Sequence, residues 1–118
     1  MRIVSVLENQ KVEKRIAITP EIAKKYITLG FDISLSENYG EHLGFKDNDY
    51  KKLGVEISHK KDQVLSDADI IVQLGLLSDE NLLLLRENQT LVGVFNPYIN
   101  KKKIENLSKK NINIFSLE

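Results

Sequence analysis

Short apolar segments rich in β-branched residues alternate along the chain with segments that carry helix signals, and this alternation most constrains the fold. Successive apolar segments begin roughly 14 to 29 residues apart, which leaves room for a crossover helix between parallel strands. Segment 31–35 alternates with a period of two, as a half-buried strand does, whereas 69–74 is nearly continuous, as in a strand covered on both faces. The predicted strands are residues 2–6, 31–35, 55–57, 69–74, 90–95 and 112–115.

Helix start and stop signals lie between these strands. Thr19 followed by Pro20 is typical of an N-cap with proline at the first helical position, and Gly30 is placed to end that helix. Alternating strands and helices imply an α/β fold in which a parallel sheet of about six strands lies between two helical layers. Flavodoxin-like and Rossmann-like domains have this three-layer architecture. Further helices are predicted over 46–53, ended by Gly54, over 60–65, from Ser78 through 82–85, and from Asn100 through 110.

Length and composition indicate one globular domain spanning residues 1–118. The chain is 42% hydrophobic, and its 17 Lys and Arg residues balance its 17 Asp and Glu residues. A zero net charge argues against a nucleic-acid-binding module, which usually has a basic excess. The longest apolar run, 82–85, is far shorter than the about 20 residues of a membrane span. The charged segment 1–15 is unlike a signal peptide, so we expect no direct membrane insertion.

Several familiar site motifs are missing from the sequence. Residues 7–10, which follow the first predicted strand, read LENQ rather than G-x-G-x-x-G, so no cofactor-binding residue is expected in this chain. There is no cysteine, and neither His42 nor His59 has a ligand-like neighbour, so we expect surface histidines and no metal site. Asp47 and Asp49 favour helix capping over a calcium loop. No G-x-S-x-G elbow is present, and no catalytic residue is assigned.

Arg15 is the first candidate for ligand binding. It lies in segment 8–20, at the carboxyl end of the first predicted strand, where open α/β sheets place ligands. Only 3 arginines occur in the chain, against 14 lysines. A guanidinium can bind a carboxylate or a phosphate through two parallel hydrogen bonds, which lysine cannot do. Arg15 is therefore a candidate substrate-binding residue, with pairing to a local glutamate as the alternative.

Asn96 is the second candidate. It precedes Pro97 at the carboxyl end of the fifth predicted strand, and the proline ends the strand and stiffens the turn. Asn96 would then project at the ligand-binding edge of the sheet, near the first loop. The alternative is an ordinary turn residue.

Several motifs together resemble a known family. Segment 15–20 reads RIAITP, and 29–31 reads LGF at the end of the predicted helix. In this order they are similar to the opening of the alanine dehydrogenase/pyridine nucleotide transhydrogenase family, and the resemblance covers essentially all 118 residues. It continues through Gly40, Phe45, Asp47, 54–57, 68–72 and the Asn-Pro turn at 96–97.

The resemblance is stronger to one branch of this family. Alanine dehydrogenases, like the similar lysine-forming saccharopine dehydrogenases, use a lysine after the fourth strand and a histidine after the fifth. Here 72–75 reads VQLG and 94–97 reads VFNP, so neither residue is present. The chain therefore more closely resembles the alpha subunit of proton-translocating NAD(P)⁺ transhydrogenase. In that branch no substrate role follows for Arg15.

The transhydrogenase resemblance implies a supporting role in a larger enzyme. Family chains continue past the sixth strand into a polar loop, a linking helix and a glycine-rich Rossmann domain, whereas this sequence ends with 116–118. We therefore expect that the NAD-binding domain is absent from this chain and that the chain alone is not catalytically competent. The intact enzyme would use NAD(H) and NADP(H), none bound by this chain alone, and would be a homodimer. It would be cytoplasmic and peripheral to the inner membrane through the membrane and NADP-binding components.

Two other functions remain open. In an alanine dehydrogenase-like substrate domain, the resemblance implies that Arg15 grips the carboxylate of a 2-oxo acid. In a non-catalytic binding or interaction module, the chain keeps the fold without the chemistry. In the family reading, the isolated domain would have an apolar face where the second domain and the terminal helices dock.

Overall fold

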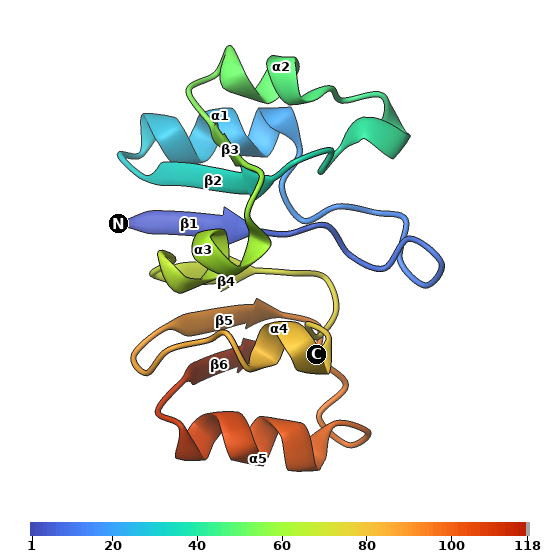
Figure 1. Cartoon of the computed structure of the whole chain (residues 1–118), viewed down its shortest axis with the longest axis vertical. Coiled ribbons are helices and arrows are strands. Elements are labelled where there is room, and N and C mark those ends of the chain that lie inside the picture. Colours follow the sequence, from blue (N-terminus) through green and yellow to red (C-terminus); the bar gives the residue numbers. More distant parts are fainter. Residues whose placement is uncertain (118) are drawn as a thin grey trace.

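The computed structural model describes residues 1–117 and confirms the predicted α/β class (Figure 1). Glu118, the last residue of the predicted domain, lies outside the described residues. Within 1–117, each predicted strand is present with its ends displaced by no more than one or two residues. The elements are β1 (Arg2–Ser5), α1 (Pro20–Thr28), β2 (Asp32–Ser36), the 3₁₀ turn η1 (Glu41–Leu43), α2 (Asp47–Lys51), β3 (Glu56–Ser58), α3 (Lys61–Ser66), β4 (Ile70–Val72), α4 (Asp79–Leu82), β5 (Thr90–Gly93), α5 (Lys101–Lys109) and β6 (Asn113–Ser116).

The six strands form one sheet in the order β3-β2-β1-β4-β5-β6, and every neighbouring pair is parallel. This is the order of the doubly wound dinucleotide-binding sheet. The chain begins at β1 in the centre, builds outward to β3, and then crosses back to β4 on the other side of β1. The strand order reverses between β1 and β4, where Ile3 lies opposite Ile70.

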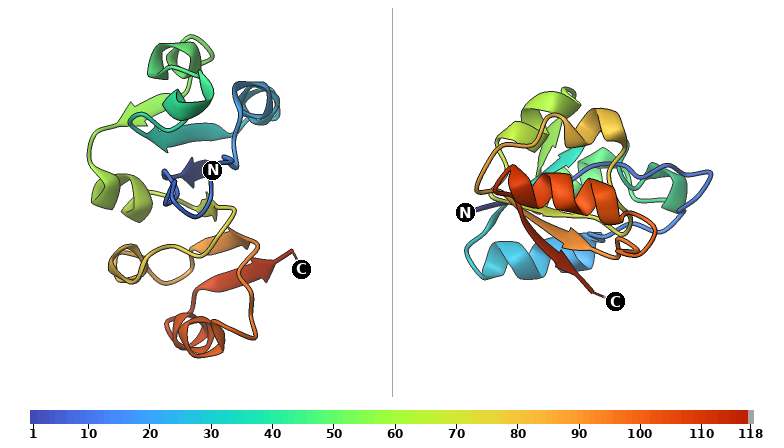
Figure 2. Two further views of the ribbon diagram at one scale, coloured as in Figure 1. Left: turned by 90° about the vertical axis from the view of Figure 1, so that its right-hand side faces the viewer. Right: turned by 90° about the horizontal axis from the view of Figure 1, so that it is seen from below.

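Helices cover the two faces of the sheet unequally. Figure 2 shows α1 on one face, beside the β1–β2 half, and α3, α4 and α5 on the opposite face. Each face has its own apolar core. The core under α3, α4 and α5 is built around Val4, Leu65, Ile71, Leu91 and Phe95. The core under α1 and α2 is built around Ile18, Ile33, Leu35, Tyr39 and Tyr50.

Local signals account for the ends of the helices. The Thr19 hydroxyl accepts a hydrogen bond from the Ile22 N–H at 3.3 Å, and Pro20 opens α1. Gly30 follows the helix with φ of 98°, a conformation that glycine adopts without steric cost. The prediction of one helix through 82–85 was wrong, because α4 ends at Leu82 and the chain continues in tighter i→i−3 turns. These turns bury Leu85 and leave Leu83 79% exposed.

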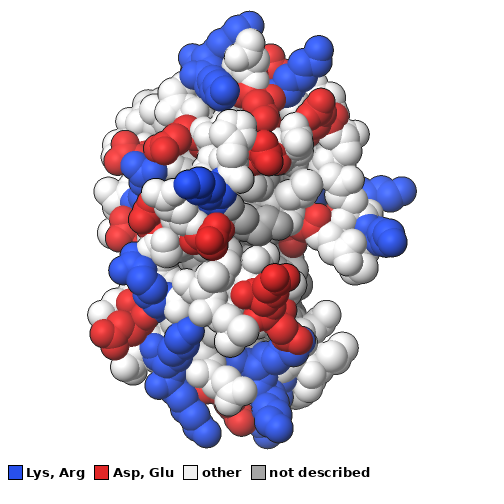
Figure 3. Space-filling model, in the orientation of Figure 1, with Lys and Arg blue, Asp and Glu red and all other residues white. Residues whose placement is uncertain are grey.

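The lysine-rich start of α5 is solvated. Lys101 and Lys102 are exposed, and Lys103 pairs with Asp79 at 3.0 Å. Figure 3 shows lysine side chains gathered near α5 at the lower end of the molecule, whereas acidic and basic residues are mixed elsewhere on this face. Among residues 1–117, no helix is long and apolar enough to cross a membrane.

The β5–β6 half of the sheet has apolar side chains on the face opposite α5. Val92, Val94, Phe115 and Leu117 alternate along the two strands with residues that pack under α5, so they share the other face. Phe115 is 59% exposed and Leu117 is 70% exposed. We call these four residues the open β5–β6 face. Exposed apolar patches of this kind are typical of docking surfaces.

Candidate functional site

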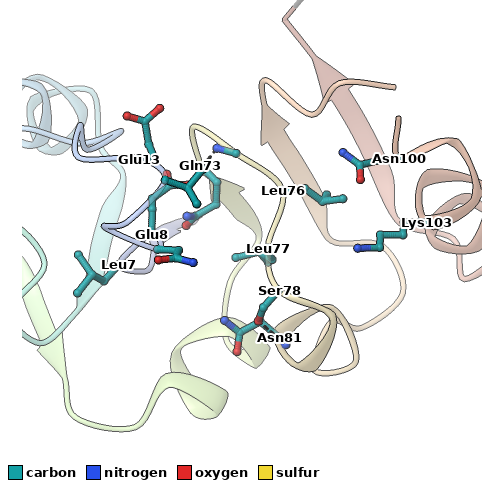
Figure 4. Close-up of a pocket in the computed structure, with 13 residues that line it drawn as sticks. Leu7, Glu8, Glu13, Gln73, Leu76, Leu77, Ser78, Asn81, Asn100 and Lys103 are labelled. Carbon is teal, nitrogen blue, oxygen red and sulfur yellow. Dashed lines mark hydrogen bonds between the residues drawn. The ribbon is translucent and has the colours of Figure 1, made fainter. Parts of the chain in front are cut away.

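A cleft of about 590 Å³ lies at the carboxyl ends of the central strands, where the strand order reverses (Figure 4). Open α/β sheets place their ligands at this switch point. One wall comes from the first loop, residues 6–19, which joins β1 to α1. The opposite wall comes from the β4 loop, residues 73–78, and from α4 and the start of α5. Glu8 and Glu13 lie on one side, and Asn100 and Lys103 lie on the other.

The Gln73 side chain closes the floor of this cleft. Its Oε1 accepts the Val6 N–H at 2.8 Å, and its Nε2 donates to the Val6 carbonyl at 3.0 Å. The amide thus reproduces the two hydrogen bonds of a peptide neighbour and links β1 to the β4 loop two residues beyond the last pair, Val4 and Ile71. Gln73 is only 3% exposed. In other doubly wound sheets the strands diverge here and admit a ligand, whereas here a side chain of the protein occupies the gap.

Glu8 joins the two walls. Its carboxylate accepts the backbone N–H of Leu74 at 2.6 Å and that of Gly75 at 2.9 Å. Burial raises the pKa of the Glu8 carboxyl above its ordinary value, although these two hydrogen bonds act in the opposite direction. The first loop is therefore bound to the β4 loop through one side chain. The Glu8 carboxylate occupies these two amides and repels a second anion from them.

Tyr39 holds the base of the first loop. Its buried hydroxyl accepts the N–H of Ala17 at 3.0 Å and of Ile18 at 3.1 Å, and lies 2.8 Å from the Ser5 Oγ. Because the Ser5 hydroxyl donates to Gln73 at 3.1 Å, the Tyr39 proton is the one shared with Ser5. A chain of hydrogen bonds thus runs from the RIAITP segment to the floor of the cleft. Burial raises the pKa of the Tyr39 hydroxyl, which keeps it a neutral donor.

Arg15 lies at the surface beside the cleft. Its Nε and Nη2 donate to the two Glu13 carboxylate oxygens at 3.0 and 2.8 Å. This fork lowers the pKa of the Glu13 carboxyl to about 2 and raises the pKa of the Arg15 guanidinium. Glu13 lines the cleft, whereas Arg15 does not. The pairing to a local glutamate is therefore observed, and the substrate role of Arg15 stays a prediction.

Asn96 lies in an exposed turn after β5, with φ of 48°. Its carbonyl accepts the N–H groups of Ile99 and Asn100, both at 3.0 Å. The side chain that lines the cleft is that of Asn100, whose Nδ2 donates to the Phe95 carbonyl at 2.7 Å. The structure thus does not bring Asn96 and Arg15 together in the cleft. The sequence analysis placed Asn100 at the start of a helix but did not assign it to the site. That position at a helix start was the one signal that could have indicated it.

The two histidines are exposed, which confirms their prediction as surface residues. The His42 Nε2 lies 2.7 Å from the Lys14 carbonyl, and its Nδ1 lies 3.1 Å from the Gln10 amide nitrogen. This pattern requires a proton on Nε2, since a carbonyl can only accept. His42 therefore anchors the outer half of the first loop to η1. Across residues 1–117, no group of three or more acidic residues or histidines is placed to hold a metal ion.

A family model described as alanine dehydrogenase/PNT, N-terminal domain, matches residues 5–118. The chain belongs to this family. The match confirms the resemblance carried by the RIAITP and LGF segments. The RIAITP segment is also the one whose backbone the Tyr39 hydroxyl holds at the base of the first loop.

The relatives of this family domain include transhydrogenase subunits. The chain is 36% identical to an NAD(P) transhydrogenase alpha-subunit protein of Rickettsia prowazekii, over 100% of this chain and 32% of that protein. The corresponding alpha-subunit protein of Rhodospirillum rubrum is 28% identical, again over 100% of this chain and 32% of that protein. This homology supports the transhydrogenase branch. The chain spans about a third of the length of these curated relatives.

Alanine dehydrogenases match over less of the sequence, and solved structures of both enzyme types share the fold. An alanine dehydrogenase of Mycolicibacterium smegmatis is 30% identical over 67% of this chain and 21% of that protein. The solved transhydrogenase from Sinorhizobium meliloti has a TM-score of 0.88 at 24% identity, over 97% of this chain and 34% of that chain. A solved L-alanine dehydrogenase has a TM-score of 0.90 at 17% identity, over 98% of this chain and 32% of that chain. These structures show that the fold is shared.

Proposed function

We propose that this chain is the N-terminal domain, residues 1–118, of a proton-translocating NAD(P)⁺ transhydrogenase alpha subunit. In this role it supports hydride transfer between NAD(H) and NADP(H) without binding either nucleotide itself. The observation that carries the proposal is the filling of the switch point by Gln73 and Glu8. A domain whose own side chains occupy the hydrogen-bonding groups at the floor of its cleft acts as a wall that shapes a site shared with other domains.

The proposed cofactors are NAD(H) and NADP(H), which the rest of the enzyme would hold. Direct hydride transfer requires the two nicotinamides to be in near-contact, and this domain would help to fix their surroundings. No catalytic residue is assigned to the chain, and the chain alone is not expected to be competent.

The proposed partners are the NAD-binding domain of the alpha subunit and the membrane and NADP-binding components. The open β5–β6 face supports a partner from the same subunit, because Phe115 and Leu117 are exposed there and the relatives are about three times as long. A homodimer in the intact enzyme and a cytoplasmic position, peripheral to the inner membrane, complete the proposal.

Calorimetry with NADH tests the closed crevice. The chain alone should give no saturable heat at micromolar NADH, whereas the chain combined with the remaining portion of an alpha subunit should bind NADH and catalyse hydride transfer to an NADP⁺-loaded component. Micromolar binding by the chain alone would overturn the wall role. Reading the gene downstream of residue 118 is an independent test. A continuing frame with a glycine-rich motif after a strand supports the proposal, and a stop with no neighbouring Rossmann gene favours a binding module.

One observation favours the dehydrogenase alternative. The Arg15 guanidinium already holds a carboxylate in a two-bond fork, with Glu13 as the occupant. A 2-oxo acid offers the same group and would have to displace Glu13. A titration with pyruvate, monitored at the Arg15 Nε–H by NMR, tests this function. A saturable shift supports it, and silence at millimolar pyruvate counts against it.

A further inference from the structure

Two successive backbone N–H groups converge on one carboxylate at the switch point. The N–H of Leu74 and the N–H of Gly75 point to the Glu8 carboxylate, with N···O distances of 2.6 and 2.9 Å. Different oxygens of the carboxylate accept the two bonds. Successive N–H groups directed at one point form a concave anion-binding nest, and hydrogen bonds to an ionised acceptor are about twice as strong as neutral ones.

The nest opens onto the cleft rather than into the core. Both Glu8 and Gly75 line the cleft, so an anion in solvent can approach the position of the Glu8 carboxylate from that side. Gly75 also leaves room, since a Cβ built on it would lie 3.6 Å from the nearest atom, a Glu8 oxygen. Glu13 and Arg15 in the first loop interact electrostatically with Glu8, and Lys103 of α5 also lines the cleft.

We propose that the N–H groups of Leu74 and Gly75 form an oxyanion-binding site that Glu8 occupies as an internal ligand, so that a carboxylate or phosphate group binds there only in exchange for Glu8. The site is independent of the hydride-transfer proposal, because it concerns the backbone of the β4 loop and not a nucleotide. Its occupant is a small oxyanion, since two N–H donors converge there and the one nearby guanidinium, that of Arg15, is paired with Glu13.

The tether of Glu8 determines how the site behaves. A carboxylate attached to the neighbouring loop competes at a millimolar or higher effective concentration, as a short linker provides. External anions must overcome that competition in the natural chain. Without Glu8, two charge-assisted hydrogen bonds to a mobile anion support millimolar affinity at best. Removal of the side chain should therefore reveal binding that the natural chain masks by about twofold or more, since the effective concentration of Glu8 is at least comparable to the dissociation constant of the anion.

The experiment is an NMR titration of the whole chain with sodium acetate and, separately, with inorganic phosphate. The variant is Glu8→Ala, and the matched control is Glu37→Ala, which removes an exposed carboxylate paired with His59 and lies outside the cleft. In Glu8→Ala, the amide resonances of Leu74 and Gly75 should move upfield. Added anion should return them toward their natural positions with a saturable, millimolar midpoint. In the natural chain and in Glu37→Ala, the midpoint of the same response should lie at least about twofold higher in anion concentration.

Each result bears on the proposal. Saturation by acetate, by phosphate or by both supports it and identifies the preferred oxyanion. A folded Glu8→Ala variant whose Leu74 and Gly75 amides ignore both anions overturns it, as does an equal response in the natural chain. If the alanine variant fails to fold, Glu8→Gln gives the same test. Its amide has one acceptor oxygen and leaves the second backbone N–H to the anion.

Discussion

Replacing Tyr39 by phenylalanine tests whether the hydrogen-bond chain beneath the first loop holds that loop in place. The substitution removes only the hydroxyl oxygen and leaves the ring, which packs edge-on against Tyr50 at a centroid distance of 6.1 Å. The lost atom is the acceptor for the N–H groups of Ala17 and Ile18 and the hydrogen-bond partner of the Ser5 hydroxyl. No other acceptor for these two N–H groups exists in the described structure.

The magnitude follows from the burial of the two N–H groups. A buried donor without a partner costs about 1–3 kcal/mol. Ile18 is fully buried and bears this cost in full, whereas Ala17 is half-buried and water can reach it. Ser5 retains its bond to Gln73. The free energy of unfolding should therefore fall by about 2–4 kcal/mol, which corresponds to a decrease in Tm of roughly 8–16 °C for a domain of this size.

Urea unfolding followed by circular dichroism measures this loss, and hydrogen exchange at Ala17 and Ile18 locates it. Tyr98→Phe is the matched control, since Tyr98 is 97% exposed and loses the same atom without burial. Its stability should stay within about 0.5 kcal/mol of the natural chain. If Tyr39→Phe loses less than about 1 kcal/mol, or if exchange at the two amides does not accelerate, the hydroxyl does not hold the first loop.

Three further predictions concern the floor and the rim of the cleft. Gln73→Leu should lose roughly 2–4 kcal/mol in urea unfolding, because the peptide N–H and C=O at the end of β1 lose their partners; a loss below about 1 kcal/mol would mean that water replaces the amide. Arg15→Ala should return the pKa of the Glu13 carboxyl from about 2 toward 4.5, as carboxyl NMR can measure. Because the pKa of Glu13 is lower in the folded chain, its pairing with Arg15 stabilises the fold above pH 4.5, and this contribution disappears as the pH falls from 4.5 to about 2. Gly93→Ala should destabilise far more than Gly30→Ala, because its Cβ would lie 2.6 Å from an aromatic ring, whereas at Gly30 only the positive φ opposes it, at about 1 kcal/mol; equal melting temperatures would contradict this.

The fold could be predicted because its signals are local. The N-cap Thr19, the helix-ending Gly30 and the period-two pattern at 31–35 are each contained within a few residues. Parallel strands need a crossover connection, usually a helix, so the alternation of strand and helix signals predicted the α/β class. The prediction of one helix from Ser78 through 82–85 was wrong because it also rested on local signals alone. A run of four leucines predicts a helix, but burial of Leu85 favours a tighter turn.

The site could not be predicted in the same way, because its contacts join residues far apart in the sequence. Gln73 meets Val6 across 67 residues, and Tyr39 meets Ser5 across 34. Neither residue belongs to a motif, and an isolated Gln or Tyr has no sequence signal for burial. Arg15 could be singled out as a candidate because arginine is rare in this chain. The structure shows its guanidinium paired with Glu13 instead of aimed into the cleft.

The two carboxylates of the first loop play parallel roles at the rim of the cleft. Glu8 occupies the Leu74 and Gly75 amides, and Glu13 occupies the fork of Arg15. Both groups are of the kind that binds anions in other proteins, and here each is satisfied by the same loop. An external anion would therefore have to break one contact for each that it forms, which lowers its affinity without changing the shape of the cleft. A first loop whose carboxylates occupy the anion-binding groups around the cleft suits a domain that forms a wall beside a nucleotide held elsewhere, because a phosphate group that enters the cleft finds these donors already occupied.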